Sequence, residues 1–561
     1  MPTFDPNSFR KQFPLIKQGA ERDGLIYFDN AATTQKPDCV LQAVERYYRE
    51  TNANVHRAAH RLSDNATRYY ENARDTAQQF LNARHRAEII WTRGTTEGIN
   101  LLANCLPLLP GDEILISALE HHANIVPWQL AAQRGGACIK VIPLNSQGDL
   151  DLEAYQQLLN SRTRLVAVTQ CSNAIGSQPD LPAMIELAHN AGALFLVDGA
   201  QSIAHHRIDL QQMGCDFFVC SGHKAFAPTG IGLLFGKRSI METLPPWQGG
   251  GEMIEHVSFE RSIYQPPPLR FEAGTPNISG AIGFAAALDM LGQLDRKQLI
   301  AHEQQLLSHA KERCLAIPGV RLVVNPEMQG PVLSLQVPTM DHKDISAQLD
   351  QAGIAVRTGH HCAMPLMQLL GLKGTIRISF SAYNQLAEVD RFADNLEQIL
   401  SQERAALAVT RPTNHQQSFD QYGKSLSFEQ VIKPLLATPQ WQQRYRKIMQ
   451  LGDNLPSLPD NFRGPENLVS GCESPVWLHS QIIDQGKDAR LELMADSESR
   501  LLRGLLSLLL CLANHRPIKE LQTFDPMPDF EPLGLERHLS PSRSNGLHRI
   551  IEQIRRRATH Y

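Results

Sequence analysis

The stretch Asp216-Phe-Phe-Val-Cys-Ser-Gly-His-Lys224 decides the fold, because an almost continuous apolar run ends there in a short polar turn. Similar runs occupy residues 113–117, 138–142, 164–169, 194–197 and 231–235. Runs of this kind, rather than alternating ones, indicate strands that are buried on both faces. With the helical patterns between them, they predict an α/β fold with a mainly parallel sheet covered by helices.

The length and charge of the chain exclude several classes of protein. Its 561 residues are enough for three or four domains. The formal charge of −4 provides no broad basic field for nucleic acid. The most apolar window, residues 505–513, is shorter than the roughly 20 residues of a membrane-spanning helix and predicts a buried helix. Residues 1–17 lack the apolar core of a signal peptide, so we expect a cytoplasmic protein.

Patterns outside the sheet region predict further units. Helical periodicity, a strand-like run at residues 332–337 and a helix near 385–403 indicate a smaller α+β domain. We expect a large domain at about 21–262 and a small one at about 263–403, which also includes the N-terminal segment. Residues 404–424 are polar and predict a linker. Residues 425–561 predict a third, α+β unit, with a sheet segment around 476–494.

Residues at the ends of the predicted strands carry chemistry. Lys224 follows a buried strand, and a desolvated lysine there can form a Schiff base. Asp198 ends another strand and could hold a protonated pyridine nitrogen, while Gln201 could donate to a phenolate oxygen. Residues 93–100 begin a helix with glycine and threonine, which can cradle a phosphate. Each feature alone also fits an ordinary turn or helix cap. Together they indicate pyridoxal phosphate (PLP).

Seven motifs follow one another along the first 403 residues: Tyr27-Phe-Asp-Asn-Ala-Ala32, Arg93-Gly-Thr-Thr-Glu97, Glu120-His-His-Ala-Asn124, Asp198-Gly-Ala-Gln201, Ser221-Gly-His-Lys224, Phe271-Glu-Ala-Gly-Thr-Pro-Asn277 and Arg357-Thr-Gly-His-His-Cys-Ala-Met-Pro365. In this order they resemble the cysteine desulfurases of the SufS/CsdA type, which are fold type I PLP enzymes. The resemblance implies an enzyme that converts L-cysteine to L-alanine, forms a homodimer, and has a large parallel-sheet domain with a small α+β domain.

The resemblance also implies roles for individual residues. Lys224 carries the cofactor, His121 stacks on its ring, and Asp198 and Gln201 contact the ring nitrogen and the phenolate. The phosphate is bound by Thr95, Thr96, Ser221 and His223, and by Thr275 of the neighbouring subunit. The substrate carboxylate is bound by Asn173 and Arg377, since the planar fork of arginine suits a bidentate contact. Arg357 is a further substrate-binding residue.

Cys362 is the predicted nucleophile. It lies in a polar loop, residues 359–365, which has glycine and proline at its ends rather than the pattern of a core strand. His360 or His361 could favour its thiolate. Two other interpretations are a buried structural cysteine and a metal site made by these three residues. Adjacent residues rarely converge on one metal without further ligands, so we expect no metal.

Cys472 stands in a second polar stretch, Val469-Ser-Gly-Cys-Glu-Ser-Pro-Val-Trp477, which suggests a loop tip. With Asp496-Ser-Glu-Ser-Arg500, Arg503-Gly-Leu505 and Leu539-Ser-Pro-Ser-Arg-Ser-Asn-Gly546, it resembles a SufE/CsdE-type sulfur acceptor over residues 425–561. The resemblance makes Cys472 the residue that accepts the persulfide. Arg543 is either a cation near it or an ordinary surface or capping arginine. The other eight cysteines are predicted to be small buried hydrophobic residues.

The sequence therefore predicts a cysteine desulfurase that passes sulfur from Cys362 to Cys472. A downstream acceptor or iron–sulfur scaffold protein would receive it for iron–sulfur cluster assembly or another sulfur-requiring pathway. One alternative is a selenocysteine lyase or another Cβ–S lyase on the same scaffold. Another makes the C-terminal unit a docking or regulatory module that carries no sulfur. Cys362 favours the first interpretation, because only persulfide formation needs that thiol.

Overall fold

The computed structural model describes the chain except residues 1–3, 57–58, 410–418, 439–440, 473, 484–488, 536–540 and 561. It divides the chain into two compact units, Met1–Ile399 and Leu400–Tyr561. Helix α15 (Leu386–Val409) continues past the boundary. The first residues of the predicted linker, 404–409, are therefore helical, while residues 410–418 of that linker lie outside the described residues.

Unit 1 is built around a seven-stranded sheet of order β2-β8-β7-β6-β5-β3-β4. Neighbours from β7 to β4 are parallel, and β8 and β2 are antiparallel to their neighbours. The mainly parallel sheet is therefore confirmed. The strands are β2 (Ile89–Thr92), β3 (Glu113–Ser117), β4 (Cys138–Ile142), β5 (Thr163–Thr169), β6 (Leu194–Asp198), β7 (Phe217–Ser221) and β8 (Gly232–Gly236).

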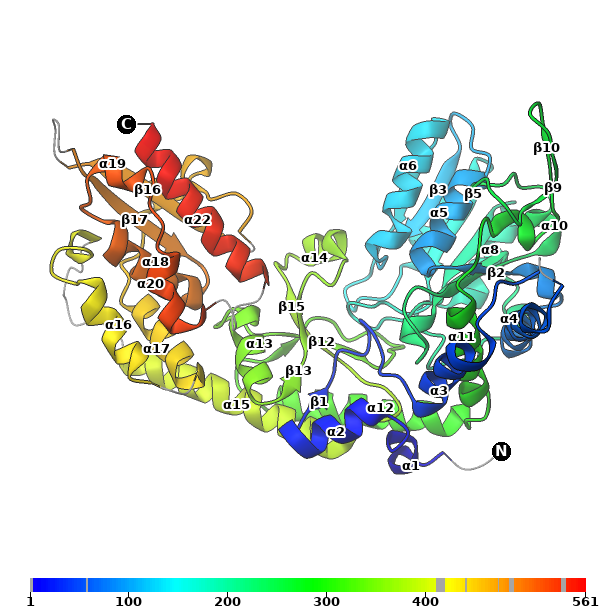
Figure 1. Cartoon of the computed structure of the whole chain (residues 1–561), viewed down its shortest axis with the longest axis horizontal. Coiled ribbons are helices and arrows are strands. Elements are labelled where there is room, and N and C mark those ends of the chain that lie inside the picture. The colour runs from blue at the N-terminus through cyan, green and yellow to red at the C-terminus, as the bar shows by residue number, and fades with distance from the viewer. Residues whose placement is uncertain are drawn as a thin grey trace. The chain divides into compact units, whose positions relative to one another are not determined.

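Helices cover both faces of this sheet (Figure 1). One face packs against α5 (Thr95–Cys105) and α6 (Val126–Gly135). The other packs against α4 (Arg61–Phe80), α8 (Leu181–Asn190) and α11 (Ile278–Gly292). Successive strand residues alternate between these two cores, as the pleat requires. The shorter elements are α1 (Pro6–Arg10), α2 (Pro14–Asp23), α3 (Asp38–Arg46), α7 (Leu152–Leu158), α9 (Leu210–Met213), α10 (Arg238–Met241), β9 (Ile254–Val257) and β10 (Ser262–Tyr264).

Two cysteines depart from the predicted burial. Cys138 is exposed because β4 lies at the edge of the sheet and has no strand beyond it. Cys39 is exposed on α3. The other six of the eight, which were predicted to be buried, are buried as expected. An apolar run cannot reveal an edge position, because strand order is set by the whole topology.

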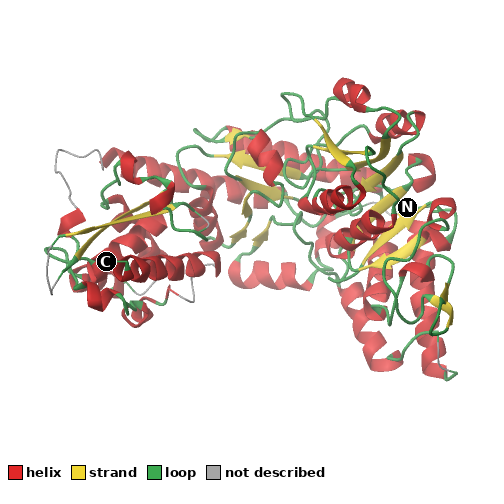
Figure 2. Cartoon of the chain, turned by 90° about the horizontal axis from the view of Figure 1, so that it is seen from above, coloured by secondary structure: helices red, strands yellow, loops and turns green. Residues whose placement is uncertain are grey.

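The rest of unit 1 forms a smaller layer (Figure 2). Its antiparallel sheet has the order β11 (Arg321–Leu322), β12 (Val332–Gln336), β15 (Thr375–Ser379) and β14 (Arg357–Gly359). The remaining helices are α12 (Arg296–Leu315), α13 (His342–Gln351) and α14 (Met364–Leu369). Near the N-terminus, β1 (Ile26–Tyr27) pairs in parallel with β13 (Ile354–Ala355) and so ties the N-terminal segment to this layer.

Unit 2 combines an antiparallel strand pair, β16 (Val476–Ile482) and β17 (Leu491–Ser497), with helices. The helices are α16 (Phe428–Leu436), α17 (Trp441–Asp453), α18 (Arg500–Ala513), α19 (Ile518–Leu521), α20 (Met527–Phe530) and α22 (Pro541–Thr559). α18 contains the apolar window and is buried, as predicted. Gly452 and Gly504 allow α17 and α18 to pack closely, because a Cβ at either would collide with the other helix. Within the described ranges, no helix is long and apolar enough to span a bilayer.

Candidate active site

A cavity of about 170 Å³ lies at the carboxyl ends of the parallel strands in unit 1, where ligands bind in such sheets. Its wall includes ten of the predicted site residues: Thr95, Thr96, His121, Asn173, Asp198, Gln201, Ser221, His223, Lys224 and Arg357. Arg377 and Cys362 contact residues of this wall. Thr275 instead lines a separate cavity of about 400 Å³ and is exposed.

The wall at the start of α5 is a cradle of donors. Ser221 Oγ accepts the Thr95 N–H at 2.9 Å and donates to Thr95 Oγ1 at 3.0 Å. Gly94 precedes them with φ +153°, and a Cβ there would lie 2.9 Å from Ser221 Oγ. The cradle therefore depends on glycine at position 94. Backbone N–H groups at a helix start, with these hydroxyls beside them, fit a phosphate group.

Lys224 and Asp198 face the same cavity from neighbouring strands. Burial lowers the pKa of Lys224 to about 8, and the charge of Asp198 opposes this shift. The neutral, nucleophilic form of the amine is therefore much more accessible near neutral pH than for an ordinary lysine. Burial raises the pKa of Asp198, one of whose oxygens accepts the Ala200 N–H at 2.9 Å. A cationic ring nitrogen beside this carboxyl would favour its ionised form, so the pair fits PLP.

His121 and Gln201 complete the wall around the predicted ring. Burial lowers the pKa of His121 to about 4, so the imidazole is neutral at pH 7. Its Nδ1 accepts the Ala123 N–H at 3.0 Å, which assigns the proton to Nε2. Gln201 Nε2 donates to the Ala31 carbonyl at 2.8 Å. Because an amide nitrogen carries two hydrogens, this bond is compatible with a second one to a phenolate.

Arg377 reaches the cavity wall from β15 of the smaller sheet. It is completely buried, and it donates to Asn173 O at 2.8 Å and to Asp29 Oδ1 at 2.7 Å. Its Nε is buried and has no hydrogen-bond partner among the described residues. Asn173 Nδ2 in turn donates to His361 O at 2.6 Å. A buried guanidinium with an unused donor suits an anionic ligand such as a carboxylate.

Replacing Arg377 with lysine is expected to raise the KM for L-cysteine about tenfold to a hundredfold. The ammonium keeps the charge but loses the planar fork, and a hydrogen bond to a charged group contributes about 1.5–3 kcal/mol. Steady-state kinetics check this result, with the cofactor absorbance and circular dichroism as controls for folding. An unchanged KM would remove Arg377 from the substrate site.

Cys362 sits in a loop with unusual backbone geometry. His361 and Cys362 have φ of +52° and +56°, which non-glycine residues rarely adopt. Cys362 O accepts the His122 N–H at 2.8 Å, and His361 Nε2 lies 2.7 Å from Thr375 Oγ1. Arg357 Nη2 lies 3.5 Å from Cys362 Sγ. The half-buried thiol therefore lies against a guanidinium.

The two histidines beside Cys362 have other contacts. Burial lowers the pKa of His361 to about 2, so this ring stays neutral and holds Thr375 rather than the thiol. His360 Nδ1 accepts the backbone N–H of Cys362 at 3.1 Å. The structure thus places Arg357, rather than a histidine ring, against Sγ.

In unit 2, Cys472 follows Gly471, whose φ is +86°. Its half-buried Sγ lies 3.7 Å from Gly546 O at the start of α22. Burial raises the pKa of Cys472, and the charge of Arg549, one turn further along α22, lowers it. Arg549 Nε lies 3.5 Å from where a Cβ of Gly471 would be. The side chain of Arg543 lies outside the described residues, so the cation that the structure places here is Arg549.

The variant Arg549→Gln is expected to slow alkylation of Cys472 about threefold at pH 7, because removal of a nearby positive charge raises the thiol pKa. Mass spectrometry of the Cys472 peptide over a series of pH values measures this rate. Arg556→Gln serves as the control, since Arg556 is exposed on the same helix and pairs with Glu552. Identical pH profiles for the two variants would show that Arg549 does not act on the thiol.

Two residues of these sites were not identified from the sequence. Arg549 belongs to no recognised motif, and its position beside Cys472 is seen only in the structure, where it lies on the face of α22 that meets this loop. Glu120 lies within a quoted motif, but its role becomes clear only from its contacts. Its buried carboxyl accepts from Asn124 Nδ2 at 2.6 Å and from the Thr169 N–H at 2.8 Å, and burial raises its pKa to about 8. It therefore fixes the segment that presents His121 to the cavity.

Family models match both units, and relatives of known name match the first. The family model "Aminotransferase class-V" matches residues 26–392, and the SufE model, "Fe-S metabolism associated domain", matches residues 429–558. A probable cysteine desulfurase of Vibrio cholerae is 46% identical over 388 residues, which are 69% of this chain and 96% of the relative. Probable cysteine desulfurase 1 of Mycobacterium leprae is 47% identical over 399 residues, 71% of this chain and 65% of the relative.

A solved structure is also similar. The crystal structure of the cysteine desulfurase CsdA from Escherichia coli, in an S-sulfonic acid form, matches with a TM-score of 0.67 and 40% identity. The match covers 72% of this chain and all of the CsdA chain. The predicted type I architecture is thereby confirmed.

Proposed function

The chain belongs to the aminotransferase class-V family, and on that basis we propose that it takes sulfur from L-cysteine onto Cys362 and passes it to Cys472. It is a PLP-dependent cysteine desulfurase with a SufE domain on the same chain. One observation supports the residue assignment above all. Lys224 and Asp198 line the same cavity as Arg357, and Arg357 contacts the Cys362 thiol at 3.5 Å.

The residues around the cavity fit the cofactor part by part. Lys224 would hold its carbonyl carbon, Asp198 its ring nitrogen, and the cradle at Thr95 and Ser221 its phosphate. When bound, PLP stabilises the negative charge that develops on the substrate Cα. The neutral imidazole of His121 lines the same cavity and adds no charge of its own.

The chain itself supplies the binding, the proton transfer and the nucleophile. Arg377 and Asn173 hold the substrate carboxylate, and the neutral amine of Lys224 accepts the Cα proton. The Cys362 thiolate attacks the substrate sulfur, so a sulfur–sulfur bond forms while the Cβ–S bond breaks. The proton of the Cys362 thiol replaces sulfur on Cβ. L-cysteine and a thiol thereby become L-alanine and a persulfide, with no external oxidant or reductant.

The second transfer is a thiol exchange. The Cys472 thiolate attacks the outer sulfur of the Cys362 persulfide, and Cys362 leaves as a thiolate. Because both cysteines belong to one chain, the acceptor is always present at the effective concentration that tethering provides. A separate acceptor, such as an iron–sulfur scaffold protein, then takes the sulfur from Cys472.

A homodimer with composite sites is part of this proposal. Thr275 is exposed and lies outside the cavity of its own subunit, which supports a contact to the phosphate site of a neighbouring one. The location proposed is the cytoplasm. All ten cysteines are unpaired, which agrees with a reducing compartment.

The initial burst of alanine, measured without added reductant, tests the transfer of sulfur from Cys362 to Cys472. Each wild-type subunit has two sulfur-accepting thiols, so we expect a burst of two equivalents of alanine per subunit. Cys472→Ser should release one equivalent and then stop. Cys511→Ser, which alters a buried cysteine of the same unit, should behave like the wild type. A burst of two equivalents of alanine from Cys472→Ser would contradict sulfur transfer to Cys472. The second candidate, a selenocysteine lyase with a docking module, is not favoured, because the similar proteins are named cysteine desulfurases and a SufE domain follows on the same chain.

A further inference from the structure

The loop that carries Thr275, residues 272–277, is fixed at both ends. Asn277 accepts the Gly280 N–H at 2.9 Å as the cap of α11, and its Nδ2 donates to Gly230 O at 2.8 Å. At the other end the side chain of Glu272 is only 7% exposed. Thr275 lies exposed between these two anchors. The anchors therefore determine where Thr275 projects.

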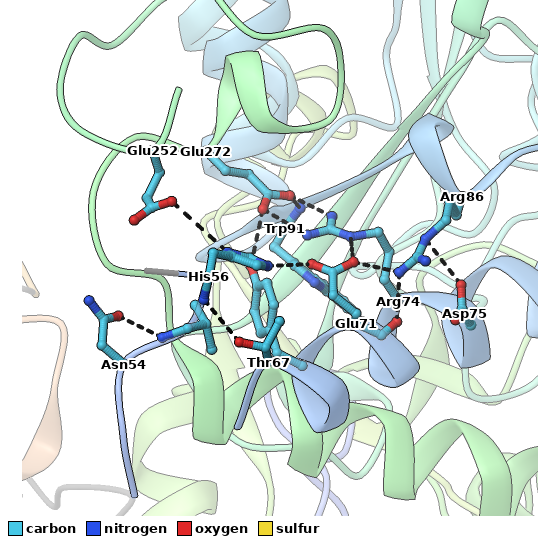
Figure 3. A network of polar contacts seen from close by, with 12 residues as sticks. Asn54, His56, Thr67, Glu71, Arg74, Asp75, Arg86, Trp91, Glu252 and Glu272 are labelled. Carbon is cyan, nitrogen blue, oxygen red and sulfur yellow. Dashed lines mark hydrogen bonds and ion pairs between the residues drawn. The ribbon is translucent and has the colours of Figure 1, made fainter. Parts of the chain in front are cut away.

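The carboxylate of Glu272 is bound by four donors from α4 and β2 (Figure 3). Oε1 accepts from Arg74 Nη1 and from the Trp91 N–H, both at 2.7 Å. Oε2 accepts from Arg74 Nη2 at 2.9 Å and from the Tyr70 hydroxyl at 3.0 Å. A carboxylate offers about four lone-pair sites, so Glu272 is satisfied entirely within the protein.

The donors that hold Glu272 keep their protons. Burial opposes the charge of Arg74, but the Glu272 carboxylate outweighs it, and the pKa of Arg74 is raised. Burial and the Glu272 charge raise the pKa of Tyr70 well above its usual value, so its hydroxyl remains a donor. The Arg74 side chain is 1% exposed, and a charge so deeply buried needs its partner. The four hydrogen bonds and the buried ion pair therefore hold the Glu272 carboxylate in one position.

The Trp91 contact connects this cluster to the phosphate cradle. Trp91 lies in β2, and the chain continues through Thr92 and Gly94 directly into Thr95. Thr92 Oγ1 donates to Gly94 O at 3.1 Å, which fixes the turn before the cradle. One carboxylate thus joins the strand that leads to the cradle of its own subunit with the loop that carries Thr275.

We propose that Glu272 is a positioning residue for cofactor binding in the partner subunit. Paired with Arg74, it holds loop 272–277 against β2 and so directs Thr275 at the partner subunit's phosphate site. Through Trp91 it links that contact to the phosphate cradle of its own subunit. This inference rests on the proposed homodimer and on the proposed role of Thr275.

The release rate of PLP from the holoenzyme tests the proposal through a double-mutant cycle. Thr275→Ala and Glu272→Gln should each speed release about tenfold, as the loss of one hydrogen bond to a charged group predicts. If Glu272 acts through Thr275, the double variant should also be about tenfold faster. A hundredfold increase, the product of independent effects, would overturn the proposal, and so would an unchanged rate for either single variant.

Two further variants separate positioning from folding. Tyr70→Phe removes one hydrogen-bond donor to Glu272 but keeps the ion pair with Arg74. It therefore replaces Glu272→Gln in the double-mutant cycle if that variant does not fold. We expect Tyr70→Phe alone to speed PLP release about threefold. Combined with Thr275→Ala, it should add nothing to the effect of Thr275→Ala. Glu71→Gln is the matched control, because Glu71 contacts Arg74 Nε at 3.4 Å on the side away from Glu272. It should leave the release rate unchanged, and a rate equal to that of Glu272→Gln would contradict the assignment.

Mixed dimers identify the subunit that is affected. Lys224→Ala in one subunit leaves a single lysine-linked chromophore in the dimer. Release from that site should be fast when Glu272→Gln is in the opposite subunit and nearly normal when it is in the same one. The reverse order would overturn the proposal. Failure of the proposed function would instead appear as a missing alanine burst in the wild type, which these release rates do not measure.

Discussion

Replacing Cys362 with serine is expected to reduce alanine release from L-cysteine by at least about 10³-fold, as loss of a covalent nucleophile does in other enzymes. A serine hydroxyl is far less acidic than a thiol, so Arg357 cannot hold it as a nucleophilic anion. Because Cys362 only contacts the cavity wall, the variant should keep the absorbance of the bound cofactor. Steady-state alanine formation and the visible spectrum measure both effects.

The control for this variant is Cys171→Ser. Cys171 also lines the cavity but is buried, and burial raises its pKa to about 12, so it supplies no thiolate. Its replacement should retain most of the turnover. If Cys362→Ser turns over L-cysteine at the wild-type rate, Cys362 does not accept the sulfur.

Replacing Lys224 with alanine is expected to remove the lysine-linked chromophore and to reduce turnover by at least about 10³-fold. The same amine is proposed to hold the cofactor and to accept the Cα proton, so both functions are lost together. Borohydride reduction of the wild type should fix the cofactor covalently to the peptide that contains Lys224. Peptide mapping identifies that link.

Lys36 provides the matched control for Lys224. Burial also lowers the pKa of Lys36 to about 8, but its Nζ donates to His223 O at 3.1 Å and it does not line the cavity. Lys36→Ala should keep the lysine-linked chromophore. A borohydride-stable link at Lys36, or one that persists in Lys224→Ala, would show that the wrong lysine was assigned.

Much of the sheet was predictable because buried parallel strands leave a strong local signal. The runs at 113–117 and 138–142 coincide with β3 and β4, and the other predicted runs differ from their strands by one residue at one or both ends. Asp198 and Lys224 could be placed together because parallel strands end at the same edge of a sheet. The strand β2 was missed, since its three apolar residues, Ile89 to Trp91, are too few to distinguish from a buried turn.

Contacts between distant segments were not predictable from one sequence. Arg74 and Glu272 are 198 positions apart, and Arg377 reaches Asn173 across 204. The sequence around each of these residues does not indicate its partner, because such pairs are determined by how helices and sheets pack. For the same reason, Arg549 could not be predicted to lie beside Cys472, because its place depends on which face of α22 meets the loop.

The persulfides of Cys362 and Cys472 after addition of L-cysteine test the account most directly. Rapid quenching and peptide mass mapping should show one added sulfur on Cys362 first and on Cys472 later. Cys472→Ser should accumulate sulfur on Cys362, and Cys362→Ser should carry none at either position. A Cys472 that never gains sulfur, or that gains it in Cys362→Ser, would contradict the transfer from Cys362 to Cys472.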